Sequence, residues 1–234
     1  MRVRFIKTGY LKYLSHLDVV RLFIRAFSRA NIPIKFSEGF NPHPRFSIGN
    51  PLPLGTESLS EYMDVELNEY MDPKEFIEKL NPILPEDIQI LQAQETTSKD
   101  SLSSTIKWSQ YSIRLMVEDK DKKTNFEKKL KGWKELQSIE IWKKKKKGKK
   151  KIEAKLDVLP LIYSITYKEV DEDGFIVLEC VLKSGETGNL KAIELIKALD
   201  EELDLGIDLD LVIIKRLEVF AEEDGIMTNS ILEQ

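Results

Sequence analysis

The alternation of apolar and charged residues at the start of the chain predicts a β-strand over residues 2–7, with Val3 and Phe5 on one face. Ser15 is a favourable N-cap and Asp18 follows three residues later, which predicts a helix from there to about residue 30. The apolar face expected for this helix consists of Leu17, Val20, Ile24 and Phe27.

The same patterns predict further elements in both halves of the chain. In the first half we expect strands at 34–36, 45–48, 61–69 and 88–92 and a helix at 72–80. In the second half we expect strands at 111–117, 139–142, 151–156, 175–182 and 211–219 and helices at 125–136 and 189–203. The order β-α-β-β-α-β in the first half is that of a ferredoxin-like module, and the second half repeats it loosely.

The predicted fold class is therefore α+β, built from tandem ferredoxin-like modules. The first module covers residues 1–94 and contains a proline- and glycine-rich motif loop at 37–55. Residues 95–106 are rich in serine and threonine and are interpreted as a linker. The second module covers 107–222, with a lysine-rich hairpin at 143–151, and residues 223–234 form a tail.

Composition narrows the class of protein. Apolar residues make up 41% of the 234 residues and aromatic residues 9%, as expected for a globular chain. No apolar run approaches the roughly 18 residues of a membrane helix. The basic start lacks the apolar core of a signal peptide, so a cytoplasmic location without membrane association is expected. Cys180 is the only cysteine, which excludes an intrachain disulfide, a cysteine-only metal site and an iron–sulfur cluster of the chain's own; no cofactor is predicted.

Charge is distributed unevenly behind the net value of −4. Residues 1–50 hold nine lysines and arginines against two acids, a net charge of +7, and residues 143–155 hold nine lysines against one acid, a net charge of +8. Such basic segments favour a polyanionic partner, and the polyanion that we expect is RNA. For the lysine-rich segment, a solvated loop is an equally good interpretation.

Three arginines of the predicted first helix, Arg21, Arg25 and Arg29, recur every four residues and so form one stripe, drifting by about 40° per step. Like charges at this spacing repel each other, and a bound anion would remove that repulsion. The guanidinium fork suits phosphate or carboxylate. The alternative is a solvated face neutralised by acids such as Asp18 or Glu38.

The segment Ser37–Arg45, with the sequence SEGFNPHPR, contains two prolines that exclude a helix. It should be a stiff loop that holds Asn41, His43 and Arg45 in fixed directions, as a recognition or catalytic loop requires. The alternative is a purely structural turn.

The two histidines of the chain, His16 and His43, lie close in sequence to Asp18 and Glu38. These four residues are the candidates for general acid–base catalysis. No ligand spacing such as HxxxH is present, so no metal site is predicted.

Several motifs resemble the bacterial radical-SAM-linked protein family, a family of unknown function. They are YLSHLD at 13–18, Arg25-Ala26, SEGFNPHP at 37–44 and PLPLG at 51–55. Glu61 and Asp64 also fit the pattern of this family, and residues 152–157 are the only later stretch that resembles it. The resemblance implies a module fused to, or encoded beside, a cobalamin-binding radical-SAM protein. It implies a radical-SAM partner but supplies no catalytic residues.

Together these observations predict an accessory, RNA-interacting module that works with a radical-SAM partner protein. One alternative is an enzyme that processes or modifies RNA without a metal, using His16 and His43. Another is a module that only docks proteins. A basic face around Arg21, Arg25, Arg29 and Arg45 favours the first function, and a cleft that joins the histidines to a carboxylate favours the second.

Overall fold

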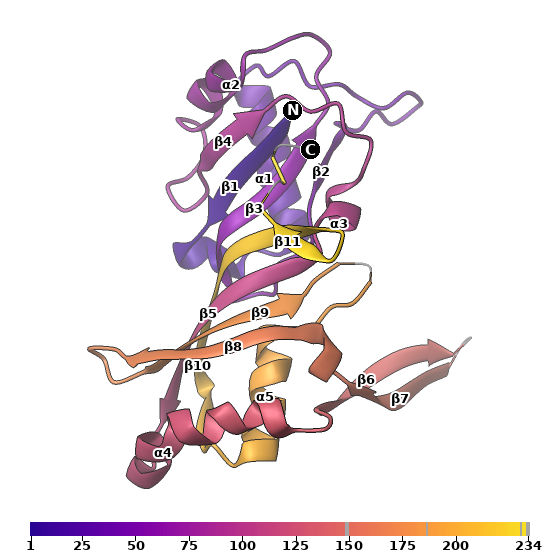
Figure 1. The fold of residues 1–234 in the computed structure, drawn as a ribbon. Coiled ribbons are helices and arrows are strands. Elements are labelled where there is room, and N and C mark those ends of the chain that lie inside the picture. The colour runs from indigo at the N-terminus through magenta and orange to yellow at the C-terminus, as the bar shows by residue number, and fades with distance from the viewer. Residues whose placement is uncertain (148–149, 186, 230, 233–234) are drawn as a thin grey trace. The chain divides into compact units, whose positions relative to one another are not determined.

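The computed structural model describes residues 1–147, 150–185, 187–229 and 231–232 (Figure 1). In these residues it has a mixed α+β architecture dominated by a large β-sheet, with five α-helices. The chain divides into two compact units, residues 1–109 with 215–234 and residues 110–214. Residues 215–222 therefore belong to the first unit, whereas the sequence pattern groups them with the second module.

The first unit contains most of the motifs singled out in the sequence. Its elements in chain order are β1 (Arg2–Lys7), the 3-10 helix η1 (Gly9–Tyr13), α1 (His16–Arg29), β2 (Phe46–Ile48), β3 (Glu57–Val65), α2 (Pro73–Leu80), β4 (Ile90–Gln94), α3 (Leu102–Thr105) and β11 (Ile226–Thr228). Strand β1 lies between β3 and β4, and β2 pairs with the end of β3, at Met63–Val65; all these pairs are antiparallel. Strand β10 (Ile207–Glu223) starts in the second unit and ends in the first, where it pairs in parallel with β3.

One face of this sheet is covered by α1 and α2. Val3 and Phe5 of β1 are buried against the two helices, and the ring centroids of Phe5 and Phe23 lie 5.0 Å apart. The buried residues of α1 are Val19, Phe23, Ala26 and Phe27. The predicted apolar face was therefore wrong at three of four positions, and Leu17 is exposed. Both the predicted and the observed set of residues follow the helical period and share Phe27. The observed set is the one that faces the core, because Phe23 packs against Phe5 and Phe27.

The ends of α1 follow local rules. The hydroxyl of Ser15 accepts a hydrogen bond from the backbone N–H of Asp18 at 3.2 Å and donates one to the Asp18 carboxylate at 2.6 Å. This confirms the predicted N-cap. After the helix, Asn31 adopts a left-handed conformation with φ of 50°, which asparagine tolerates better than most residues.

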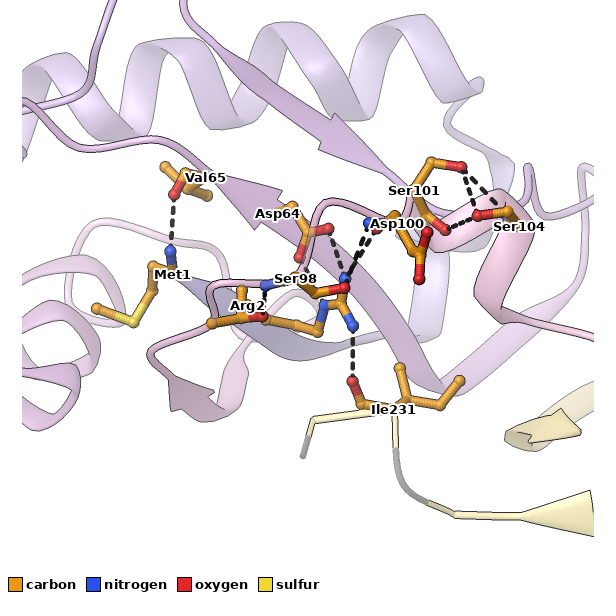
Figure 2. A network of polar contacts seen from close by, with 10 residues as sticks. Met1, Arg2, Asp64, Val65, Ser98, Asp100, Ser101, Ser104 and Ile231 are labelled. Atoms are coloured by element: carbon orange, nitrogen blue, oxygen red, sulfur yellow. Dashed lines mark hydrogen bonds and ion pairs between the residues drawn. The ribbon is translucent and has the colours of Figure 1, made fainter. Parts of the chain in front are cut away.

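A buried arginine links the N-terminal strand to two distant segments of the first unit. The guanidinium of Arg2 has no exposed surface and donates hydrogen bonds to both carboxylate oxygens of Asp64, from Nε at 2.8 Å and Nη2 at 2.9 Å. As Figure 2 shows, it also donates to the backbone carbonyls of Ile231, at 3.0 Å, and Asp100. The predicted tail and linker are thus attached to β1 by the same side chain.

The second unit carries its own core. Its elements in chain order are β5 (Trp108–Val117, whose first two residues belong to the first unit), α4 (Lys120–Lys131), the 3-10 helix η2 (Gly132–Glu135), β6 (Glu140–Lys147), β7 (Lys150–Asp157), the 3-10 helix η3 (Leu159–Leu161), β8 (Ile162–Val170), β9 (Ile176–Lys183), α5 (Ala192–Leu203) and the start of β10. The strand order is β10-β5-β9-β8, while β6 and β7 form a separate two-stranded ribbon. Cys180 of β9 is buried in the core, and burial raises the pKa of its thiol.

Several segments differ from their predicted structure. Residues 162–170 form strand β8, which the sequence pattern did not show, and the predicted strand at 34–36 makes only isolated bridges. The predicted linker includes α3, whose Leu102 is buried, and the predicted tail includes β11. The predicted lysine-rich hairpin is present as β6 and β7, although its tip at 148–149 lies outside the described residues.

Two features are absent from the part of the chain that the structure describes. No helix there combines the length and apolar character needed to span a bilayer. Nor do the described histidine, cysteine and acidic residues gather in any group of three or more able to hold a metal ion.

Candidate nucleic-acid interface

The arginine stripe lies on the exposed side of α1, away from Phe23 and Phe27. Arg21 pairs with Asp18 at 3.1 Å. The pKa of the Asp18 carboxyl is lowered, first by the hydrogen bond from Ser15 and then by Arg21. In the part of the chain that the structure describes, Arg25 and Arg29 have no carboxylate within ion-pair distance. Two of the three predicted anion-binding arginines are therefore available to a ligand.

Arg25 and Arg29 also line a surface pocket of about 250 Å³. Leu22 and Ala26 of the same helix form part of its wall, and the segment after α2 closes the other side with Ile83 and Pro85. Two cations beside a partly apolar depression can bind a phosphate or carboxylate and pack against an apolar group next to it.

The motif loop is held at its base and open at its tip. The backbone N–H of Ser37 donates to the carbonyl of His43 at 2.8 Å, and the N–H of His43 donates to the hydroxyl of Ser37 at 2.9 Å. Between them the ring of Phe40 is fully exposed, and Asn41 is exposed as well. Figure 1 shows this segment, between α1 and β2, reaching outward as a narrow loop. The loop presents an aromatic ring and polar groups to solvent.

Arg45 stands at the base of the loop and is partly neutralised. Its Nη1 lies 3.2 Å from the carboxylate of Glu66, which Lys35 approaches at 3.7 Å. One acid thus serves two cations, and this corner of the unit keeps a local positive charge.

The candidate acid–base residues fall into two places. His16 and Asp18 occupy the first turn of α1, whereas Glu38 and His43 lie on the exposed loop. Among the described residues no hydrogen bond or ion pair joins His16 to His43 or Glu38. The convergence of the two histidines on one ligand stays a prediction.

His16 instead lines a small cavity of about 20 Å³, together with Lys7 and Glu61. The apolar part of its wall comes from Phe5, Val19, Ile48 and Leu52. Such a volume is about that of one water molecule. A histidine, a lysine and a carboxylate beside one water site form a small acid–base cluster.

Lys7 and Glu61, which line this cavity, form a cluster of buried charges with Arg216. Lys7, Glu61 and Arg216 are each at most 5% exposed. Arg216 Nη1 donates to Glu61 at 2.8 Å, while the Lys7 ammonium donates to the carbonyls of Leu14, at 2.8 Å, and Lys12, at 3.2 Å. Burial lowers the pKa of Lys7, Glu61 opposes this effect and Arg216 adds to it. Buried charges at such density are typical of functional sites as well as of structural ion pairs.

Sequence reasoning missed Lys7 and Arg216 as site residues. The only local signal is a charged residue at a strand position that alternation would assign to the core. The pairing of β1 with β3 shifts register between Phe5 and Lys7, and this irregularity brings Lys7 close to Ser58 and Glu61.

The fold and these surfaces describe a small α+β protein with an exposed cationic helix and a buried charge cluster. Residues 1–192 match the family described as "Uncharacterized protein conserved in bacteria (DUF2344)". The chain belongs to this family. The description names neither an activity nor a radical-SAM protein.

Other comparisons add little. No curated protein matches the chain. One similar solved structure is a chain of the "Crystal Structure of a Cbf5-Nop10-Gar1 Complex", at 10% sequence identity and a TM-score of 0.49. The match covers 95% of this chain and 50% of that chain, so this chain spans half the length of the one it matches. The score is too low to carry an argument about function.

Proposed function

We propose that the protein is an RNA-interacting module whose primary contact surface is the exposed side of α1. The observation that carries the proposal is the pair Arg25 and Arg29, which line one pocket and have no acidic partner in the described chain. RNA supplies phosphates at regular spacing, and each guanidinium can make two hydrogen bonds to one phosphate. The exposed ring of Phe40 adds a surface on which an unpaired base can stack.

We infer further that each unit is a ferredoxin-like module. The support is the strand order, which is β4-β1-β3-β2 in the first unit and β10-β5-β9-β8 in the second. If the strands of each unit are numbered along the chain, both orders become 4-1-3-2. In the second unit the ribbon of β6 and β7 is then an insertion after the first helix of the module.

Replacing both Arg25 and Arg29 with alanine should weaken RNA binding and flatten its salt dependence. For the unmodified protein we expect log affinity to fall with log salt at a slope of about −2 to −4, since three or four phosphates are neutralised. The double variant should lose about one unit of slope for each phosphate contact removed. Fluorescence anisotropy with a labelled RNA at several salt concentrations measures both quantities.

Lys74→Ala is the matched control, because Lys74 is an exposed cation on the neighbouring helix α2 and lies outside the pocket. It should leave affinity and slope nearly unchanged. All three substitutions remove exposed side chains and should leave the melting temperature within a few degrees of the original. The control removes one positive charge and the double variant two. A loss in the control of half that of the double variant or more would therefore mean that only net charge matters and that α1 is not the surface.

The radical-SAM partner implied by the sequence resemblance is a second part of the proposal. An accessory role accounts for a chain that offers binding surfaces without a catalytic motif. Copurification from a bacterial lysate, followed by identification of both protein and RNA, tests it. Recovery of RNA without any radical-SAM protein would remove the partner from the proposal and leave the RNA interaction.

A second candidate function is acid–base chemistry on RNA, favoured by the cavity that His16 shares with Lys7 and Glu61. If this function holds, His16→Asn should abolish any metal-independent change in an RNA substrate. His43→Asn should retain it, because His43 is not part of the cavity. Mass spectrometry of RNA incubated with each variant in a chelator distinguishes the two. Equal activity of the His16 variant and the original protein would exclude the cavity as the reaction centre.

A further inference from the structure

Trp142 on β6 is the most exposed of the three tryptophans. Its side chain is 67% exposed, whereas Trp133 is 9% exposed and the indole N–H of Trp108 donates to Glu222 at 2.5 Å. A large aromatic ring left in water forgoes the free energy that its burial would contribute. The ring of Trp142 is therefore a candidate contact for a ligand.

Two lysines lie beside Trp142 near the base of the ribbon, Lys143 on β6 and Lys155 on β7. The directly opposite residue on β7 is Lys155, whose ammonium lies 5.7 Å from the centroid of the indole ring. Two lysines near the base of the ribbon are neutralised, Lys155 by Glu140 at 2.6 Å and Lys143 by Glu194 of α5 at 2.8 Å. These ion pairs fix the base of the ribbon and the position of the aromatic ring.

The sequence of the ribbon is strongly basic. Residues 143–155 hold nine lysines against one acid, a net charge of +8. A charge of this sign and density attracts a polyanion, so the composition of the ribbon favours an anionic ligand.

We propose that the β6–β7 ribbon is a binding platform for single-stranded RNA, with one base stacked on Trp142 and the RNA phosphates attracted by the net positive charge of residues 143–155. This deepens the RNA-interacting function proposed above by naming unpaired strands as the ligand and a surface in the second unit. Stacking requires a base with a free face, which a duplex hides and an acidic peptide lacks. The aromatic ring thus separates this ligand from others that lysine alone would attract.

The test is binding of a fluorescein-labelled uridine 12-mer to the whole protein, followed by anisotropy. Trp142→Ala should weaken binding by about five- to hundredfold, as expected for loss of one stacked base. Trp142→Phe keeps an aromatic ring and should retain most of the affinity. Neither change should move the melting temperature by more than a few degrees, because the ring is exposed.

Two competitors complete the experiment. Unlabelled single-stranded RNA should displace the 12-mer more effectively than duplex RNA or polyglutamate of the same charge. Unchanged affinity of Trp142→Ala, or equal competition by polyglutamate, would overturn the proposal. The variant Arg25→Ala/Arg29→Ala separates the two surfaces: if it binds normally while Trp142→Ala does not, the α1 surface fails and the ribbon stands. The reverse result removes the ribbon alone.

Discussion

Replacing Asp64 with alanine is expected to lower the free energy of unfolding by about 3 kcal/mol, because it leaves the guanidinium of Arg2 buried without its carboxylate. Arg2 has no exposed surface, and both of its hydrogen bonds to Asp64 would be lost. We take the lower end of the usual range because the Asp64 side chain is itself 27% exposed. Urea denaturation followed by circular dichroism measures the change.

Glu66→Ala serves as the control for Asp64, being the next acid on the chain and part of the Lys35 and Arg45 ion pairs. Its side chain is 56% exposed, and exposed pairs contribute at most about 1 kcal/mol. A small loss for Glu66→Ala beside a large one for Asp64→Ala is the expected result. Similar losses of unfolding free energy for both variants would show that the buried Arg2 network stabilises the protein no more than an exposed ion pair does.

Removing Glu61 should cost about 3–5 kcal/mol of unfolding free energy, since it is the carboxylate that Arg216 and Lys7 share at the centre of the buried cluster. Glu57→Ala, on the same strand, is the control. Glu57 approaches Lys215 at 3.0 Å and Lys12 at 3.8 Å, but these lysine side chains are 41% and 23% exposed. Water can solvate them once the carboxylate is gone, so a loss of about 1 kcal/mol is expected.

The pH dependence of Glu61→Ala provides a second measurement. Burial holds the pKa of Lys7 below its ordinary value in the native state, and Glu61 partly restores it. Without Glu61 the native pKa falls further, so native Lys7 releases its proton at a lower pH than the unfolded chain does. Stability of the variant should therefore recover as pH rises from the native pKa toward 10.5, the ordinary value. A deficit that is constant with pH would show that Lys7 and Glu61 are not coupled.

Much of the first unit could be predicted from the sequence because its signals are local. The cap at Ser15 and the end of α1 at Asn31 depend on residues within one helical turn. Strand β8 was missed because its pairing with β9 shifts register near Ser164 and again near Glu169. Each shift interrupts the alternation of apolar and polar residues on which strand prediction depends.

The candidate interface was likewise predictable only where it is local. The spacing of Arg21, Arg25 and Arg29 defines a stripe on any helix, and their exposure follows from the aromatic residues on the opposite side. The buried cluster depends on a long-range pairing: Arg216 reaches Glu61 across 155 residues of chain. No periodicity in the sequence reports such a contact, and without it the charge of Lys7 at a position on the core face of β1 has no visible partner.

The division of the chain has a consequence for its synthesis. Residues 110–214 form one compact unit, and along the sequence they separate the two segments of the other unit. During synthesis, Arg216, the ion-pair partner of Glu61, is added 155 residues after Glu61. Ile231, whose carbonyl accepts a hydrogen bond from Arg2, is added 229 residues after Arg2. The second unit can therefore complete its folding before the first. This reverses the usual order, in which the N-terminal part of a protein folds before the rest. If synthesis ends just after residue 214, the released chain therefore contains a complete second unit and an incomplete first unit. In that first unit β3 lacks its pairing with β10, which leaves part of its edge uncovered.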